Sequence, residues 1–229
     1  MAGLDPAIHV FLPGIALKTW MPGTRPGMTE NVVAVADLSI SEQKAELRAA
    51  ALAKRDALPA EERQRGAETV ATRPFPIAIA AGAVVSGFMP MRTEINPLPL
   101  MRRLAGEGAQ LALPVIQGRG KPLLMRAWSF GAPLEARQWG IKEPLDEAPV
   151  VAPDILLVPL ACFDRSGHRI GYGAGYFDKT IRALRATKSV VAIGLAFAAQ
   201  EIDRVPATDF DERLDLVLTE REVIDLRGH

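Results

Sequence analysis

Cysteine and histidine are scarce in this chain of 229 residues, which contains one cysteine and three histidines. The single cysteine, Cys162, excludes an internal disulfide and a cysteine-rich zinc site, and it is typical of a protein of the reducing cytosol. Cys162 and His168 flank a short turn with no third group to orient them, which argues against a thiol nucleophile. We therefore expect a cytoplasmic protein that does not use thiol chemistry.

Net charge and long hydrophobic runs are also lacking. Lys plus Arg and Asp plus Glu each total 27, so the chain has no global field that would attract nucleic acid or an anionic membrane. The apolar stretches at 77–91 and 190–199 are interrupted, or shorter than the roughly 20 residues of a membrane span. We expect neither a membrane nor a nucleic-acid partner, and any anion site must be built locally.

The chain divides into two regions of different character. In residues 1–38, proline, glycine and isolated apolar residues alternate without helix or strand periodicity. We expect an irregular, poorly ordered N-terminal arm there, and our hypothesis is that it is not native but comes from an over-extended translation start, with Met28 as the better candidate for the natural start. Residues 39–225 are expected to form a single domain.

Short apolar segments alternate with helical patterns in that domain. Ser39-Ile-Ser-Glu42 has the form of a capping box and predicts the start of a helix. Helices are predicted at about 40–57, 60–72, 97–105 and 176–186. Strands are predicted at 83–88, 110–113, 123–128, 154–158, 190–196 and 214–218. This alternation predicts a three-layer α/β/α fold with a mostly parallel sheet.

The most informative stretch is 155–178, where an apolar run ends at a polar turn. Arg169 follows the turn, and Gly171, Gly173 and Gly175 then alternate before a helix-like segment. Glycines allow positive φ and a close approach of the backbone to a phosphate, and a helix N-terminus adds free N–H groups. The spacing fits neither a P-loop nor the dinucleotide fingerprint, and an ordinary flexible turn remains the alternative.

Other polar residues are candidates for the same site. Lys44 and Arg48 lie on one face of the first predicted helix, with Arg55 two turns further on, and form either an anion site or a solvated basic face. Glu94 follows a buried strand, where α/β sheets place ligands, or it stabilises a helix dipole. Trp139 either stacks on a flat ligand or packs its loop onto the core.

Asp178 and Asp215 are the candidates for a metal site. Asp215 interrupts an apolar run, so its carboxylate needs a cation, hydrogen-bond donors or water. Two carboxylates are what Mg²⁺ accepts while it keeps waters and phosphate oxygens. A helix-capping Asp178 and a solvent-facing Asp215 on an edge strand are the alternatives.

Taken in order, several segments resemble the 5-formyltetrahydrofolate cyclo-ligase (5,10-methenyltetrahydrofolate synthetase) family. The resemblance covers about residues 41–219, and its specificity lies in the combination rather than in any one segment. The segments are Lys44-x-x-x-Arg48, Phe88–Ile95, Trp139–Pro144, Val158–Asp178 and Val205–Leu218.

The resemblance implies a soluble, monomeric enzyme that converts 5-formyltetrahydrofolate to 5,10-methenyltetrahydrofolate with ATP and Mg²⁺, releasing ADP and phosphate. It implies catalytic roles for Glu94 and Arg169, and Mg²⁺ ligation by Asp178 and Asp215. The implied ATP contacts are Lys44, Arg48, Arg169, Gly171, Tyr172, Gly173, Ala174, Gly175, Tyr176 and Phe177. The implied folate contacts are Met91, Glu94, Trp139, Tyr172 and Tyr176.

The chain departs from the family pattern in two places. Asn96 stands where the family often has an acid, and Tyr172 and Ala174 replace basic side chains found in the glycine loop of some members. These departures leave open a non-catalytic module that binds nucleotide or folate on the same scaffold. A sugar-phosphate isomerase or a CoA transferase is a further alternative, although no independent motif supplies the carboxylate nucleophile that a CoA transferase needs.

Overall fold

The computed structural model describes residues 38–228. The expected irregular arm at 1–38, together with the predicted initiator Met28, lies outside the described residues except for Leu38. In the described part of the chain, none of the helices has the length and apolar character that a membrane span requires.

A seven-stranded sheet forms the centre of the domain, in the order β11-β10-β9-β6-β1-β2-β3. Its strands are β1 (Val84–Ser86), β2 (Gln110–Val115), β3 (Leu124–Ala127), β6 (Ile155–Pro159), β9 (Val191–Leu195), β10 (Leu216–Leu218) and β11 (Val223–Asp225). The strands from β10 to β2 are parallel, and the edge strands β3 and β11 pair antiparallel to their neighbours. The predicted mostly parallel sheet is therefore confirmed.

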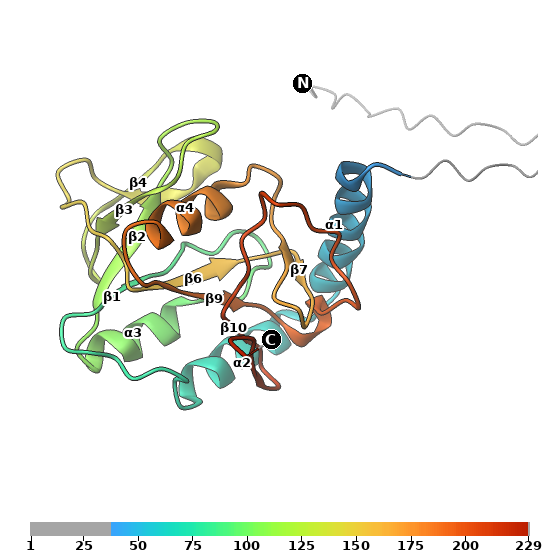
Figure 1. Cartoon of the computed structure of the whole chain (residues 1–229). Helices are drawn as coiled ribbons and strands as arrows, with labels where there is room; N and C mark the ends of the chain where they lie inside the picture. The colour runs from blue at the N-terminus through green and yellow to red at the C-terminus, as the bar shows by residue number, and fades with distance from the viewer. Residues whose placement is uncertain (1–37, 229) are drawn as a thin grey trace, which may run out of the picture. The chain divides into compact units, whose positions relative to one another are not determined.

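Helices cover both faces of this sheet (Figure 1). The helices α2 (Ala60–Thr72) and α3 (Leu98–Gly106) pack on the face that includes Leu157 and Ile193. The opposite face, which includes Leu156 and Val158, is covered by α4 (Tyr176–Arg185). Successive residues of a strand point to opposite faces, so the continuous apolar run of β6 supplies both layers of the core. The predicted three-layer α/β/α arrangement is confirmed.

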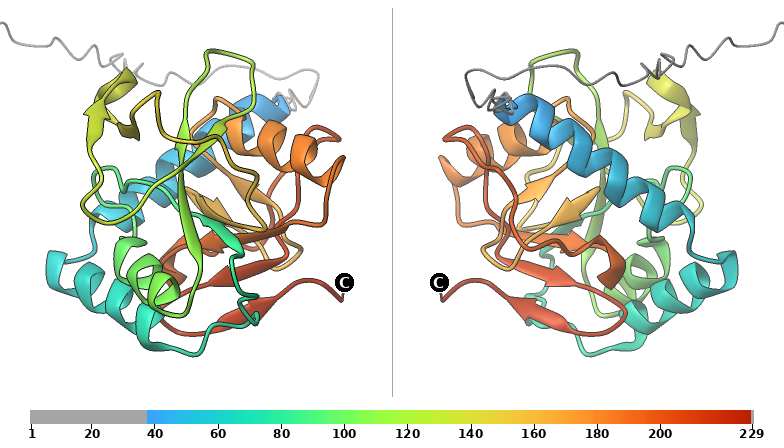
Figure 2. Two further views of the ribbon diagram at one scale, coloured as in Figure 1. Left: turned by 90° about the vertical axis from the view of Figure 1, so that its left-hand side faces the viewer. Right: turned by 90° about the vertical axis from the view of Figure 1, so that its right-hand side faces the viewer.

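The first helix, α1 (Ile40–Asp56), begins at the predicted capping box. The N–H of Glu42 donates to the Ser39 hydroxyl at 3.3 Å, and the N–H of Ser39 donates to the Glu42 carboxylate at 2.9 Å. Leu47 and Ala51 of this helix pack against the hairpin of β7 (Cys162–Phe163) and β8 (Arg169–Ile170). The helix therefore runs beside the segment that leads into the glycine-rich stretch (Figure 2).

The sequence predicted the three-residue strands β1 and β10 within longer apolar segments, but it did not predict the other short elements. These are the β7–β8 hairpin, the edge strand β11, the hairpin of β4 (Leu134–Ala136) and β5 (Lys142–Pro144), and the 3₁₀ helices η1 (Gln138–Gly140) and η2 (Ala198–Gln200). Strands of two or three residues are too short to show a periodicity, so tertiary contacts alone define them.

Candidate active site

A cavity of about 390 Å³ opens beyond the carboxyl ends of β1, β2 and β6. Its lining includes Phe88, which follows β1, Pro114, the second-last residue of β2, and Pro159, the last residue of β6. Ligands of parallel α/β sheets bind at this edge, and the volume falls in the range of small-molecule sites. The cavity is therefore the candidate active site.

Most of the residues singled out from the sequence line this cavity. They are Met91, Glu94, Trp139, Arg169, Gly171, Tyr172, Ala174, Gly175, Tyr176, Phe177 and Asp178. Lys44, Arg48, Gly173 and Asp215 do not line it. Arg55, a member of the predicted basic helix face, also lines it, and so does Glu143, which the sequence did not single out.

The glycine loop, residues 171–175, joins β8 to α4 along one wall. Gly173 and Gly175 have φ values of +98° and +64°, in the left-handed region that favours glycine. Gly175 is the N-cap of α4, and no side chain caps this helix end. The first N–H groups of α4 are therefore open to the cavity side, where they can receive an anion.

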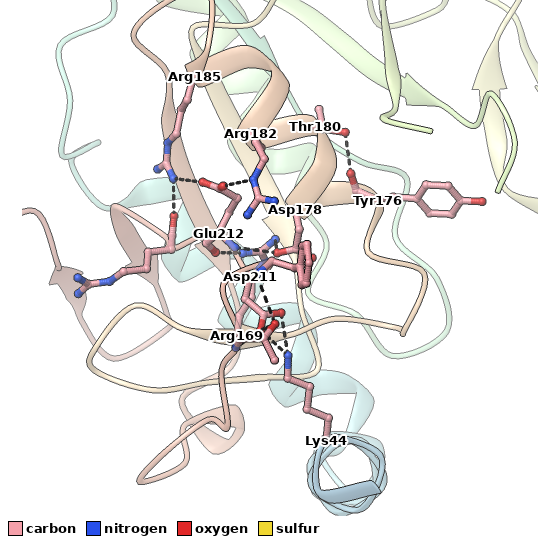
Figure 3. A network of polar contacts seen from close by, with 12 residues as sticks. Lys44, Arg169, Tyr176, Asp178, Thr180, Arg182, Arg185, Asp211 and Glu212 are labelled. Carbon is pink, nitrogen blue, oxygen red and sulfur yellow. Dashed lines mark hydrogen bonds and ion pairs between the residues drawn. The ribbon is translucent and has the colours of Figure 1, made fainter. Parts of the chain in front are cut away.

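The basic face of α1 lies beside this loop. Nε of Arg48 donates to the carbonyl oxygen of Gly171 at 2.6 Å, and its guanidinium nitrogens lie next to Gly173. Lys44 reaches Asp211 instead, with Nζ 2.6 Å from the carboxylate (Figure 3). The structure thus brings Arg48 to the loop, whereas the charge of Lys44 is balanced by a neighbouring acid.

Arg169 and Asp178 form an ion pair at the base of the loop. Arg169 is only 6% exposed, and its Nη2 donates to Oδ1 of Asp178 at 2.8 Å (Figure 3). Its Nη1 donates to the carbonyl of Glu212, and the N–H of Glu212 donates to the same Oδ1 of Asp178. Burial lowers the pKa of Arg169, while Asp178 and Asp211 act to raise it. The pair holds the start of α4 against the 211–212 segment.

The structure does not bring Asp215 to Asp178. Asp215 directly precedes β10, and its Oδ2 accepts hydrogen bonds from Arg185 and from the N–H of Ala192, each at 2.7 Å. These contacts lie at the amino ends of β9 and β10, away from the cavity at the carboxyl ends of the strands. Asp215 is therefore engaged by Arg185 and Ala192 and does not line the cavity that Asp178 lines, and the Asp178–Asp215 metal pair stays a prediction.

The described residues offer no larger cluster of metal ligands. Among residues 38–228, no group of three or more Asp, Glu, His or Cys side chains is placed to hold a metal ion. Asp178 lines the cavity, and both of the hydrogen bonds that it accepts end on Oδ1, which leaves Oδ2 for a metal. A site with one protein carboxylate fits a Mg²⁺ ion that arrives on phosphate oxygens.

Glu94, Tyr172 and Arg55 are linked across the cavity. Arg55 donates to the Tyr172 hydroxyl at 2.6 Å, and the Tyr172 hydroxyl hydrogen-bonds to Glu94. Glu94 also accepts from the N–H of Met91 at 2.7 Å. Burial raises the pKa of Glu94, although Tyr172, Met91 and Arg55 each oppose this shift. Arg55 continues the basic face of α1, which was the signal in the sequence for its position.

Trp139 lines the cavity at an exposed position, whereas Asn96 does not line it. Trp139 is 62% exposed and has a φ of +57° within η1, so its indole ring stands in a sharp turn rather than in the core. The Asn96 side chain accepts from the N–H of Leu98 at 3.0 Å, at the start of α3, and does not line the cavity. The departure at Asn96 therefore leaves the lining of the cavity unchanged.

Comparison with known proteins gives a consistent result. The model of the 5-formyltetrahydrofolate cyclo-ligase family matches residues 40–220. A 5-formyltetrahydrofolate cyclo-ligase from Mycolicibacterium smegmatis is 32% identical over 193 residues, which cover 80% of this chain and 97% of the relative. One from Escherichia coli K12 is 29% identical over 177 residues, which cover 74% and 96%.

Solved structures agree with the sequence comparisons. The structure of 5,10-methenyltetrahydrofolate synthetase from Aquifex aeolicus matches with a TM-score of 0.68 and 30% identity, covering 81% of this chain and 94% of that one. The synthetase from Mycoplasma pneumoniae matches with a TM-score of 0.60 over 77% and 98% of the two chains. At 21% identity, the second match shows a shared fold alone.

Proposed function

The chain belongs to the 5-formyltetrahydrofolate cyclo-ligase family, and we propose that it converts 5-formyltetrahydrofolate to 5,10-methenyltetrahydrofolate at the expense of ATP, with Mg²⁺ as the metal. The products are then ADP and phosphate. The observation that carries this proposal is the contact between Arg48 and the glycine loop, which sets phosphate-binding groups beside a cavity of about 390 Å³.

The reaction needs an activated formyl group. A formamide oxygen is a poor leaving group, and N10 of the folate is a weakly nucleophilic arylamine. Transfer of the γ-phosphoryl group to the formyl oxygen makes the formyl carbon electrophilic. N10 then attacks that carbon and gives up its proton to solvent or a protein base, the five-membered ring closes, and phosphate departs with the former formyl oxygen. In such transfers the protein mainly positions the groups and stabilises charge.

The phosphates of ATP fit the glycine loop. Arg48 and Arg169 supply positive charge, and the open N–H groups of the loop and of α4 donate to phosphate oxygens. Lys44 lies on the same face of α1 and would exchange Asp211 for a phosphate oxygen. Mg²⁺, bound to the phosphates, would take Asp178 as its protein carboxylate and would neutralise charge on the transferred group.

The folate fits the cavity itself. Met91, Trp139 and Tyr176 provide apolar and aromatic walls for a flat ring system. Glu94 is held by Tyr172 and Met91, and its raised pKa suits a carboxyl that keeps or passes a proton on the ring. Holding N10 against the activated carbon contributes several kcal/mol by proximity, on the order of the effective-molarity gains of intramolecular reactions.

One assay tests this function. The protein is incubated with 5-formyltetrahydrofolate, ATP and Mg²⁺, and the absorbance of the methenyl product is followed with ADP and phosphate measured in parallel. We expect product only when ATP is present, with one ADP and one phosphate for each methenyl group formed. Binding of folate and nucleotide without product would instead identify a non-catalytic binding module on the same scaffold.

A further inference from the structure

Glu143 is a buried acid in the wall of the cavity. It lies on β5 and is 1% exposed. Its Oε1 accepts a hydrogen bond from the N–H of Ile116 at 3.2 Å, but its Oε2 has no hydrogen-bond partner among the described residues. A buried carboxyl oxygen without a donor is costly, so the position calls for a donor that the protein does not itself supply.

The nearby cation does not meet this need. Nε of Arg137 is 4.0 Å from Oε2 of Glu143, beyond hydrogen-bond distance. Its guanidinium contacts two exposed acids instead, Glu135 at 3.3 Å and Asp146 at 3.1 Å. Burial raises the pKa of Glu143, and Ile116 and Arg137 oppose this shift only in part.

The cavity walls near Glu143 indicate which kind of ligand could donate a hydrogen bond to its Oε2. Pro114, Ile116, Ile141 and Trp139 line the cavity around it with apolar and aromatic surface. Such walls favour a flat ring, and a flat ring reaches Glu143 with its edge. Glu94, a partly buried acid of the cavity, already accepts from the N–H of Met91 and from Tyr172.

We propose that Glu143 is the positioning residue that recognises the donor edge of the pterin, formed by its N3–H and 2-amino group. The inference rests on the proposed function, which supplies a ligand with a planar pair of N–H donors. Oε2 would accept from one donor, and Oε1 has a second lone pair for the other beside the Ile116 N–H. Glu143 would thereby fix the ring in one orientation within the cavity.

A purely structural role of Glu143 accounts for the hydrogen bond to its Oε1 but not for its unpaired Oε2. The hydrogen bond from Ile116 fastens β5 next to β2, and that bond uses Oε1 alone. In Glu143→Gln, the amide oxygen still accepts from Ile116 and the shape is kept. The amide NH₂ then replaces Oε2 and points a donor at the ligand's donors, so this variant separates recognition from folding.

Glu135→Gln is the matched control. Glu135 pairs with Glu143 in the register of β4 and β5 and contacts the same Arg137, but it is 58% exposed and does not line the cavity. We expect Glu143→Gln to raise KM for 5-formyltetrahydrofolate by about tenfold or more, the equivalent of one lost hydrogen-bonded pair, while kcat changes by less than about threefold. Glu135→Gln should leave both constants within about twofold.

A second ligand makes the test independent of the variant's folding. The wild-type protein should bind 2-desamino-5-formyltetrahydrofolate, measured by calorimetry, about tenfold more weakly than the parent compound. Glu143→Gln should lose this discrimination. Equal binding of both ligands by the wild type would overturn the proposal, as would an unchanged KM or unchanged discrimination in Glu143→Gln. If the wild type binds the two folates with different affinities but forms no methenyl product in the activity assay, then the ligase function is rejected and the recognition role of Glu143 is kept.

Discussion

Nε of Arg48 lies 2.6 Å from the carbonyl oxygen of Gly171, so the first helix is joined directly to the glycine loop. The same side chain places its two terminal nitrogens beside Gly173. A basic helix face can be solvated or can serve an anion, and this contact favours the second interpretation, because the charge lies beside the open N–H groups of α4.

Replacement of Arg48 by Ala tests the phosphate role of this face. We expect KM for ATP to rise by about tenfold or more, since a charge-assisted contact contributes about 1.5–3 kcal/mol. The free energy of unfolding should fall by about 1 kcal/mol, because one hydrogen bond to Gly171 is lost. Lys54→Ala, at an exposed position of the same helix, is the control and should leave KM within about twofold. Unchanged ATP kinetics in Arg48→Ala would place the triphosphate elsewhere.

Arg169 and Asp178 are expected to be essential for turnover. Arg169→Ala and Asp178→Ala should each abolish product formation, because both groups line the cavity at the proposed phosphate site. Each change also leaves a partly buried charge unpaired, which we expect to lower the free energy of unfolding by about 2–4 kcal/mol. The double variant should lose less than the sum of the two single variants in urea unfolding.

Arg182→Ala is the control for that pair. Arg182 lies on α4 and pairs with Glu212, but it is exposed and does not line the cavity. Its loss should change turnover by less than about twofold. Near-normal activity in either Arg169→Ala or Asp178→Ala would remove the ion pair from the mechanism.

The sequence predicted the layers and the glycine loop because both have strong local signals. The apolar run at Ile155–Pro159 is continuous, as expected of a strand buried on both faces. The capping box at Ser39 and the glycines before Tyr176 fix helix starts by local chemistry alone. By contrast, no periodicity reveals the β4–β5 hairpin, so the burial of Glu143 follows only from its packing near β2.

Asp215 differs from Glu94 in its place along the strand. It lies at the amino end of β10, whereas ligands of parallel sheets bind at the carboxyl ends. The same rule correctly places Glu94, which follows β1. The direction of the strand is therefore the feature that separates a structural acid from one that lines the cavity.

Asp215→Asn should affect stability rather than metal use. The change weakens the contacts with Arg185 and with the N–H of Ala192, and we expect the free energy of unfolding to fall by about 1–2 kcal/mol. The Mg²⁺ concentration for half-maximal turnover should stay within about twofold of the wild type. Asp178→Asn, in contrast, should raise that concentration. A large increase for Asp215→Asn would show that Asp215 is a metal ligand.

Glu94 should make the stability of the protein depend on pH. Burial raises the pKa of Glu94 above its usual value of 4.5, so the folded protein keeps a proton that the unfolded chain has lost. The contribution of Glu94 to the free energy of unfolding is fully present below pH 4.5 and is lost as the pH rises through the raised pKa. The loss is about 1.4 kcal/mol for each pH unit by which the folded pKa exceeds the unfolded one. Glu94→Gln cannot ionise. The free energy of unfolding of Glu94→Gln minus that of the wild type should therefore increase with pH and then level off.

Urea unfolding at a series of pH values measures this difference, and Glu42→Gln provides a control of opposite sign. Hydrogen bonds from Ser39 lower the pKa of Glu42, so its contribution is lost as the pH falls, and the difference for Glu42→Gln should decrease as the pH rises. Glu143 is also a buried acid with a raised pKa, but it is present in both proteins of each comparison and cancels. If the difference for Glu94→Gln does not vary with pH, then Glu94 titrates as an exposed carboxyl, and it would be fully ionised at neutral pH and unable to hold a proton for the folate ring.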